Sequence, residues 1–217
     1  MTYSVVICDS KSKKLGVAVA TCHFAVGALV PHLKAGVGAI ATQAATNPYL
    51  GINGLEKMAE GKSIEQSFFS VLEGDSEKES RQLHGVDYLG NSWAWTGNTT
   101  IEWAGHIKGK NYSVAGNMLA GEKVVKACVD AIESNKLLPL EERMLRALQA
   151  GENAGGDKRG RQSAALITIK DQPFPYCNIR VDDNKDPLTE LERLLKEFRE
   201  SYYQEFISAI PNNHPLK

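Results

Sequence analysis

The chain has 217 residues, 24% of them charged, and its acidic and basic side chains nearly balance to a net charge of −1. A near-neutral surface creates no field that attracts nucleic acid or an anionic membrane, so we expect neither as a partner. The length suits one well-buried core without a low-complexity linker, which predicts a single domain over residues 1–217.

Two further features indicate a soluble, cytoplasmic protein. The sequence has no run of about 18 apolar residues, and its N-terminus lacks the apolar stretch of a signal peptide. The cysteines are scattered without CxxC spacing, which is typical of reduced thiols in the cytosol. They are Cys8, Cys22, Cys128 and Cys177.

The N-terminal part of the chain predicts a buried β-hairpin. Residues 3–8 and 15–21 have apolar strand patterns, and the polar residues 9–14 connect them. A third apolar run, residues 37–41, follows a glycine-rich bend. Thr2 is therefore expected at the edge of a sheet core rather than on a frayed terminus.

Two helices are predicted after these strands. Residues 46–51 form a turn cluster, and a short helix then starts at Leu55 and ends at Gly61. Ser63 begins the next helix, and Gln66 three residues later completes a capping box. We expect this pair of helices to cover one face of the sheet.

Residues 82–87 and 92–96 alternate as two further strands. Trp93 and Trp95 share one face of the second strand. They could form a ligand platform, but packing within the sheet is the commoner use of aromatic side chains at this spacing.

The remaining elements repeat this order of strands followed by two helices. That order indicates two antiparallel sheets stacked between helix layers. The later elements are expected at residues 103–106, 112–115, 122–135, from Pro139 onward, 163–169 and 178–181.

The last predicted helix runs from Pro187 to about Ile210, with Asp186 as its N-cap. Its aromatic end carries Tyr202, Tyr203 and Phe206. This end suits the interface of a homodimer, which is the assembly we expect. Packing of the helix on its own domain explains the pattern about as well.

Thr2 is the first candidate for catalysis. Initiator methionine is readily removed before a small residue, and Thr2 then combines a hydroxyl with a free α-amine. An unperturbed α-amine has a pKa of about 7.7–8.0, so part of it can accept a proton near pH 7. A threonine activated by its own N-terminus is a known nucleophile. The alternative is that Thr2 is only a small residue after the start codon.

A glycine-rich polar stretch, residues 155–163, is the second candidate region. Glycines let a backbone approach a ligand and expose N–H donors, as in anion sites and oxyanion holes. Arg161 is expected to bind a substrate carboxylate through its planar fork. A solvated loop is the alternative, which we prefer for Lys158 and Arg159. The residues expected to line a substrate site are Asp157, Arg161, Gln162 and Ser163.

Five motifs are spread along the chain, at residues 2–6, 24–27, 31–38, 116–119 and 160–165. Together they resemble the DUF1028 family, bacterial and archaeal proteins of undefined function placed among the N-terminal-nucleophile (Ntn) hydrolases. The resemblance covers nearly the whole chain. It implies an α+β fold, the four-layer αββα sandwich with two antiparallel sheets between helix layers, but it implies no particular substrate.

The Ntn resemblance also suggests a partner for Thr2. Proteasome-type members use a lysine about thirty positions after the nucleophile to lower its pKa, and Lys34 has that spacing. A surface lysine is an equally good interpretation of Lys34. The acidic partner that proteasomes carry after the second strand is not evident, because residues 20–22 are Ala, Thr and Cys. This difference weakens any transfer of proteolysis.

No metal or cofactor is expected. His23, His32 and His84 do not have metal-ligand spacing, and Asp182 most simply starts a turn. His23 follows the second strand and is expected to form a polar wall of the substrate site or to act as a general acid. Cys22 is a weak rival nucleophile. The neighbouring His23 could not act as its base, because successive side chains of a strand point in opposite directions.

The sequence therefore predicts an amidohydrolase that cleaves a C–N amide bond of a small or peptide-like substrate through Thr2. The α-amine acts as the base, and Asn117 or Gln162 helps backbone N–H groups to hold the oxyanion. The alternative is a protein that binds a small ligand on the same scaffold without turnover.

Overall fold

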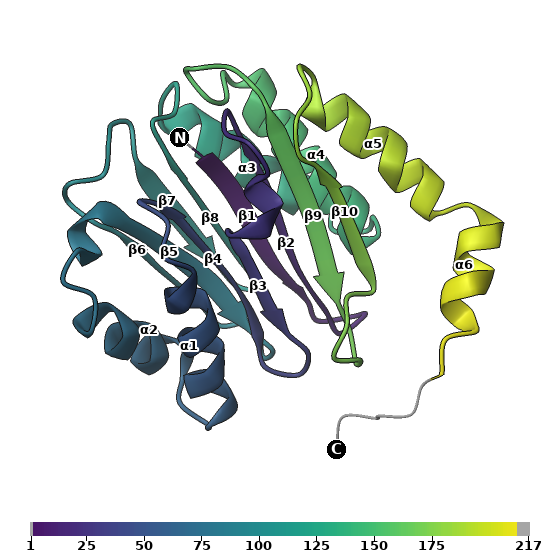
Figure 1. Ribbon diagram of the computed structural model, residues 1–217, viewed down its shortest axis with the longest axis horizontal. Coiled ribbons are helices and arrows are strands. Elements are labelled where there is room, and N and C mark those ends of the chain that lie inside the picture. The colour runs from purple at the N-terminus through teal and green to yellow at the C-terminus, as the bar shows by residue number, and fades with distance from the viewer. Residues whose placement is uncertain (1, 212–217) are drawn as a thin grey trace.

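The computed structural model describes residues 2–211, which form two antiparallel sheets and six α-helices (Figure 1). The larger sheet has the strand order β10-β9-β2-β1-β8-β7 and the smaller one β3-β4-β5-β6. The strands of the larger sheet are β1 (Thr2–Asp9), β2 (Lys14–Thr21), β7 (Gly105–Gly109), β8 (Tyr112–Asn117), β9 (Ser163–Ile169) and β10 (Cys177–Val181). Those of the smaller sheet are β3 (Pro31–Lys34), β4 (Gly38–Ala44), β5 (Arg81–Asp87) and β6 (Ser92–Thr96).

Helices lie on the outer faces of both sheets. The smaller sheet is covered by α1 (Pro48–Ala59) and α2 (Ile64–Glu73). The larger sheet is covered by α3 (Glu122–Ser134), α4 (Leu140–Asn153) and α5 (Pro187–Phe198). The described chain also contains α6 (Ser201–Ser208) and two short 3-10 turns, Val26–Ala28 and Lys78–Ser80. The mixed α/β character and the two antiparallel sheets expected from the sequence are confirmed.

The central strand β1 is apolar on both sides because both sides are covered. Successive side chains of a strand point to opposite faces. Tyr3 and Val5 pack against the helices of the larger sheet, whereas Ser4 and Val6 face the smaller sheet. A strand that is buried on both faces has a nearly continuous run of apolar residues in its sequence.

Apolar cores fill the spaces between these layers. Leu148 and Leu166 belong to the core between the larger sheet and its helices, and Phe68 to the core outside the smaller sheet. Val17 and Val19 belong to the core between the two sheets. Burying one such side chain contributes about 1.5–3 kcal/mol to folding, so these cores supply the main driving force.

Helix α1 begins earlier than the sequence analysis predicted. Residues 48–51, expected in a turn, form its first turn. The Asn47 side chain accepts a hydrogen bond from Tyr49 N at 3.1 Å, and Pro48 supplies the fixed φ angle suited to the first helical position. For α2, the predicted capping box of Ser63 and Gln66 is confirmed.

The two tryptophans of β6 are packing residues. Trp93 is buried, with its ring 5.5 Å from that of Phe68 and 5.1 Å from that of Phe69 on α2. Trp95 is partly buried and donates from its indole N–H to Lys78 O at 3.2 Å. Neither ring is left as a platform for a ligand, so the packing interpretation is confirmed.

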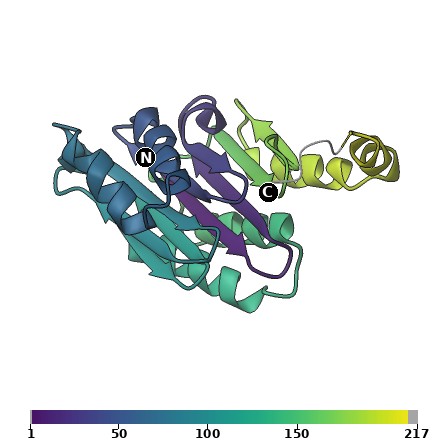
Figure 2. The ribbon, with the colours of Figure 1, turned by 90° about the horizontal axis from the view of Figure 1, so that it is seen from below.

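The last helix is not continuous, contrary to the prediction of one helix over residues 187–210. It breaks between α5 and α6, because Glu200 adopts an extended backbone with a ψ angle of 143°. The Gln204 side chain donates to Phe198 O at 2.5 Å and so caps the end of α5. Figure 2 shows α6 beyond the edge of the larger sheet, next to the end of α5, and none of its residues is buried. The homodimer stays a prediction.

The described chain contains no disulfide, and all four cysteines are free. Cys8, Cys128 and Cys177 are buried, and burial raises the pKa of each thiol. Within residues 2–211, no helix combines the length and the apolar character that crossing a membrane requires.

Candidate functional site

Four polar side chains form a row across the larger sheet at one of its ends. Thr2 pairs with Thr21 on β2 and with Asn117 on β8, and Thr21 pairs with Ser163 on β9. Side chains at paired positions lie about 5 Å apart, so each member of the row is a neighbour of the next. Tyr3, the neighbour of Thr2, faces the helices, so the row faces the smaller sheet. All four residues are buried.

Thr2 is the first residue of β1, and 9% of its surface is exposed. Its Oγ1 lies 3.2 Å from Oγ1 of Thr21, which holds the hydroxyl within the row. Tyr3 anchors the same end of β1 on the opposite face, since its hydroxyl donates to Leu148 O at 3.1 Å and to Glu152 Oε2 at 3.1 Å. Burial raises the pKa of Tyr3 well above its ordinary value, so the phenol remains a donor. Met1, and therefore its expected removal, lies outside the described residues.

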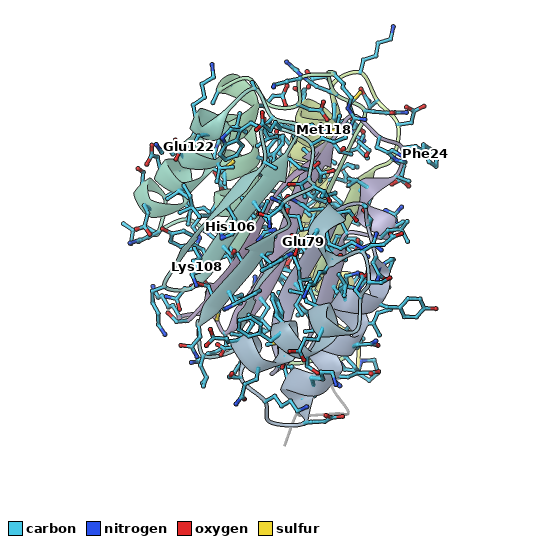
Figure 3. The ribbon with its side chains drawn as sticks, turned by 90° about the vertical axis from the view of Figure 1, so that its left-hand side faces the viewer. Phe24, Glu79, His106, Lys108, Met118 and Glu122 are labelled. Carbon is cyan, nitrogen blue, oxygen red and sulfur yellow. The ribbon has the colours of Figure 1, made fainter. Side chains whose placement is uncertain are left out.

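A cavity of about 340 Å³ opens beside Asn117, the neighbour of Thr2 in the row. Its walls are the ends of β4 and β8, the 3-10 turn before β5, and the loop between β6 and β7. None of the lining residues carries a charge; they include Ala44, Ser80, Thr99, Thr100, Ile101 and Met118. Figure 3 shows Met118 near the upper end of the molecule, with Glu79 of the 3-10 turn below it.

The backbone is strained around this end of the sheets. Ala44 at the end of β4 has a φ of 69°, and Met118 after β8 has a φ of 55°. Ala25, in the segment that follows β2, has a φ of 52°. A left-handed conformation costs a residue other than glycine about 1–2 kcal/mol. Strain of this kind is concentrated at functional sites, so it adds to the case for a site here.

A hydrogen-bonded chain of polar side chains fills the space between the sheets next to Asn117. Asn117 Nδ2 donates to Gln82 Oε1 at 3.1 Å, and Gln43 Nε2 donates to the same oxygen at 2.7 Å. Ser4 Oγ donates to Gln43 Oε1 at 2.6 Å and lies 2.7 Å from His84 Nε2. We call these side chains, together with Ser113, the inter-sheet network.

His84 lies at the other end of the inter-sheet network from Asn117 and is fully buried. Its Nδ1 is 3.1 Å from Ser113 Oγ. Burial, helped by the charge of His106, lowers the pKa of His84 to about 3, so the ring is neutral at physiological pH. From the sequence, His84 was considered only as a metal ligand, and the network was not predicted. The one local sign of the network in the sequence is that Gln82 and His84 alternate with apolar residues along β5.

Lys34 is not brought to Thr2. It is exposed at the end of β3 and pairs with Gly38, at the start of β4, whereas Ser4 meets Gln43 near the other end of β4. Figure 1 shows the start of β1 and the end of β3 at opposite ends of the sheets. Gly38 and Gln43 are five residues apart on β4, which corresponds to roughly 17 Å at ~3.3 Å per residue, too far for a charge in water to affect a hydroxyl.

Asp157 lies near the row but its carboxylate is already in use. Asp157 Oδ2 accepts from Cys22 N at 2.8 Å, and Oδ1 accepts from Arg159 N at 2.8 Å. The Arg159 guanidinium lies 3.2 Å from the same carboxylate. Asp157 therefore connects the segment after β2 to the glycine-rich loop. Its carboxylate has a structural role and is not available to bind a substrate.

Ser163 and His23 are also occupied with holding this segment. Ser163 Oγ donates to His23 O at 2.5 Å and accepts from Val26 N at 3.1 Å. The imidazole of His23 is exposed, and its Nδ1 lies 3.0 Å from Phe24 O. Phe24 is at the surface, at the upper right of the molecule in Figure 3. Ser163 belongs to the row and His23 follows the strand that carries Thr21, but the contacts of both side chains are with backbone.

Arg161 and Gln162 are directed away from the Thr2 hydroxyl. Arg161 Nε pairs with Glu152 Oε1 at 2.5 Å, and Nη1 lies 3.5 Å from Asp186 Oδ1. The fork expected to bind a substrate carboxylate is thus engaged by two carboxylates of the helix layer. Gln162 Nε2 donates to Asp183 Oδ1 at 3.2 Å, which leaves Asn117 as the amide side chain beside Thr2.

No metal centre is formed among residues 2–211, since no three His, Cys, Asp or Glu side chains gather at one place there. A larger cavity, about 460 Å³, lies between the β9–β10 loop and α6. That loop follows Ile169, at the opposite end of β9 from Ser163. The smaller cavity at Asn117 is the one that meets the polar row.

The sequence of the chain matches a known protein family. The model of a family of unknown function, DUF1028, matches residues 2–191 of the chain. No curated protein shows significant similarity to it.

Among solved structures, the crystal structure of protein SPO2555 from Silicibacter pomeroyi, which carries the same family designation, is similar with a TM-score of 0.91. It is 30% identical in sequence, and the match covers 97% of this chain and 91% of that chain. Anbu (ancestral beta-subunit) from Yersinia bercovieri matches with a TM-score of 0.38 and 12% identity, over 98% of this chain and 99% of its own. A TM-score that low supports no conclusion about this chain.

Proposed function

Because the chain belongs to the DUF1028 family, whose function is unknown, we propose from its site that it is an Ntn amidohydrolase with Thr2 as the nucleophile. The observation that carries the proposal is the position of Thr2, at the start of a buried strand and paired with Asn117, which lines an uncharged cavity. In this proposal the two sheets and their outer helices are the αββα sandwich of the Ntn hydrolases.

The reaction needs no group beyond those of the chain, water and the amide. After removal of Met1, the α-amine of Thr2 takes the proton of its hydroxyl, and Oγ1 forms a bond to the carbonyl carbon. The C–N bond then breaks, and the leaving amine takes the proton. Water hydrolyses the resulting ester, with the same α-amine as base, and restores Thr2. The contact with Thr21 supports this role because it orients the hydroxyl before reaction.

Asn117 is the proposed oxyanion donor. Its Nδ2 has two protons, and only one hydrogen bond is made by this side chain within the described residues. The second proton is available to the oxygen that becomes negative when the carbonyl is attacked. A fixed donor of this kind contributes about 10²–10³ to the rate in other hydrolases.

The cavity suggests which amides are bound. Its lining consists of alanine, hydroxyl, amide, isoleucine and methionine side chains, without a cation or an anion. A charged group would lose its hydration there without gaining a partner. The proposed substrate is therefore a small or peptide-like amide whose group next to the scissile bond is uncharged.

One observation favours a second function, the binding of a small ligand without turnover. The lysine with the proteasome-type spacing, Lys34, is exposed at the far end of the sheets. Thr2 therefore lacks that means of lowering its pKa, and the α-amine has to act alone. A protein that only binds an uncharged ligand in this cavity has no need of such activation.

Intact-mass measurement after treatment with a hydroxyl-directed electrophile, such as a β-lactone, tests the proposal. The wild type should start at Thr2 and gain one label on that residue, whereas Thr2→Ala should gain none. Thr21→Val is the matched control, since it removes the other half of the same hydrogen bond and leaves the nucleophile, so it should still be labelled. A protein that keeps Met1, or is labelled equally as Thr2→Ala, would rule out the mechanism and leave the binding function.

A further inference from the structure

The inter-sheet network has a direction, and Gln82 sets it. Gln82 Nε2 lies 2.9 Å from Gly116 O and 3.1 Å from Gly105 O. Backbone carbonyl oxygens can only accept, so the nitrogen of the Gln82 amide must face them. Its Oε1 must then face the opposite way, toward Gln43 and Asn117. The usual ambiguity between nitrogen and oxygen in an amide side chain is removed at this position.

The fixed orientation of Gln82 determines that of Asn117. An oxygen can attract only a donor, so Asn117 must present Nδ2 to Gln82 Oε1, at 3.1 Å. Asn117 lines the cavity and makes no other side-chain hydrogen bond within the described residues. Its second N–H and its Oδ1 are the groups left over for a ligand.

We propose that Gln82 is a positioning residue that orients the carboxamide of Asn117 toward the cavity beside Thr2. The inference rests on the proposed function, because the orientation matters only if Asn117 meets the substrate of Thr2. Gln82 itself is fully buried and touches no part of the cavity, so its effect on a bound amide passes through Asn117.

The same logic extends along the rest of the network. Gln43 gives its nitrogen to Gln82, so its Oε1 faces Ser4 and accepts the Ser4 proton. Ser4 Oγ then accepts from His84 Nε2, which leaves Nδ1 of the neutral ring to accept from Ser113. Every donor along this path meets an acceptor. Reversing one amide would set donor against donor or acceptor against acceptor at its neighbours, so the network locks Gln82 from both sides.

Gln43 offers a matched control. It is fully buried like Gln82, belongs to the same network and contacts the same Oε1 atom, but it does not contact Asn117. Gln82→Met and Gln43→Met both remove one buried carboxamide at similar volume. A general loosening of the fold would affect Asn117 similarly in both variants, whereas a positioning role predicts a difference between them.

The first experiment measures the Asn117 side-chain amide by ¹⁵N NMR, with its signals assigned from their loss in Asn117→Ala. In the wild type, one Nδ2 proton should exchange with solvent about a hundredfold more slowly than those of the exposed Asn98. The protection should disappear in Gln82→Met and persist in Gln43→Met. Exchange in the wild type as fast as that of Asn98 would overturn the proposal, and once the signals are assigned this comparison needs only the wild-type protein and no enzymatic activity.

The second experiment is a double-mutant cycle on the rate of β-lactone labelling of Thr2. Gln82→Met should label about tenfold more slowly than the wild type, and Asn117→Ala more slowly still. If Gln82 acts through Asn117, the double variant should be no slower than Asn117→Ala, and Gln43→Met should stay within about twofold of the wild type. Multiplicative effects, or an equal loss in Gln43→Met, would overturn the inference. Absence of labelling in the wild type contradicts the proposed function instead, and the exchange measurement still decides whether Gln82 positions Asn117.

Discussion

The space between the two sheets is divided into an apolar part and a polar part, and they are built on different principles. The apolar part, with Val17, Val19 and Ala165, is held by contacts that depend on size and shape. The polar part is the inter-sheet network, in which each group requires a particular partner in a particular orientation. An apolar core tolerates swaps of similar volume, whereas a buried amide without its partner costs about 1–3 kcal/mol. The part that meets Asn117 is therefore the part whose geometry is most strictly determined.

Nearly all buried hydrogen-bonding groups of the polar part have a partner. Among the described residues, the fully buried side-chain atoms that lack a hydrogen-bond partner belong to Ser67 and Arg143, not to the inter-sheet network. A fully paired buried network specifies one arrangement, at the expense of tolerance to mutation. The difference between the two parts can be tested through stability, starting with the change of largest expected effect.

Gln82→Met should be the most destabilising of these changes. It removes the hydrogen bonds of the Gln82 carboxamide with Gly105 O, Gly116 O, Thr96 Oγ1, the Gln43 amide nitrogen and Asn117 Nδ2, and each buried group left without a partner costs about 1–3 kcal/mol. Chemical denaturation should show the free energy of unfolding lowered by about 3–6 kcal/mol. A loss below about 1 kcal/mol would mean that water or repacking satisfies these groups, and the strict geometry assigned to the polar part would be wrong.

Acidification should weaken the polar part through His84. Its pKa is lowered from 6.5 to about 3 in the folded chain, so between these values the unfolded chain binds a proton that the folded chain does not. The contribution to stability is complete above pH 6.5 and falls by about 1.4 kcal/mol per pH unit as the pH decreases toward 3. Urea titrations at several pH values check this. His84→Gln should reduce the slope over that window, and an unchanged slope would show that other groups cause it.

Val17→Ala samples the apolar part. Removing buried methyl groups and leaving a partly collapsed cavity should cost about 2 kcal/mol, with no pH dependence between pH 7 and 5. Denaturation of the variant at both pH values checks this. If the cost changed strongly with pH, the two parts would be coupled rather than independent.

The smallest effect is expected at the strained rim. Ala44 has a φ of 69°, a conformation that glycine adopts without a steric penalty. Ala44→Gly should raise the free energy of unfolding by up to about 1 kcal/mol, since relief of strain is partly offset by the greater freedom of glycine in the unfolded chain. Thermal denaturation measures the change. Val17→Gly, in a strand interior, should have the opposite sign.

The elements that could be predicted from the sequence are those with local signals. Ser63 and Gln66 lie within one turn of each other, so their capping box is visible in the sequence. The start of α1 was missed because Asn47 and Pro48 suit a turn as well as a helix N-terminus. The break before α6 depends on Gln204 reaching back to Phe198 O, a contact that the sequence pattern does not reveal.

The candidate site was predictable only in part, because strand register and ion pairing are not local. Thr2 and Asn117 were both predicted as site residues from the sequence, but their pairing across β1 and β8 required the structure. Arg161 looks like an anion-binding residue until Glu152 and Asp186, brought in by two helices, are seen to engage it. In the sequence, Gln82 has the pattern of a residue on the solvent-exposed face of a strand. That face is buried because the other sheet packs against it.

The anchoring of Tyr3 has a consequence for the entropy of the chain end. The first residues of a domain usually fray, and the order that a reaction needs then has to be imposed at the moment of binding. Here β1 is paired on both edges from its first residue, and the phenol of Tyr3 is fastened to Leu148 and Glu152 on α4. Thr2 therefore loses its conformational freedom when the domain folds, before any ligand binds. Thr2, the first residue of β1, therefore behaves thermodynamically like an interior residue.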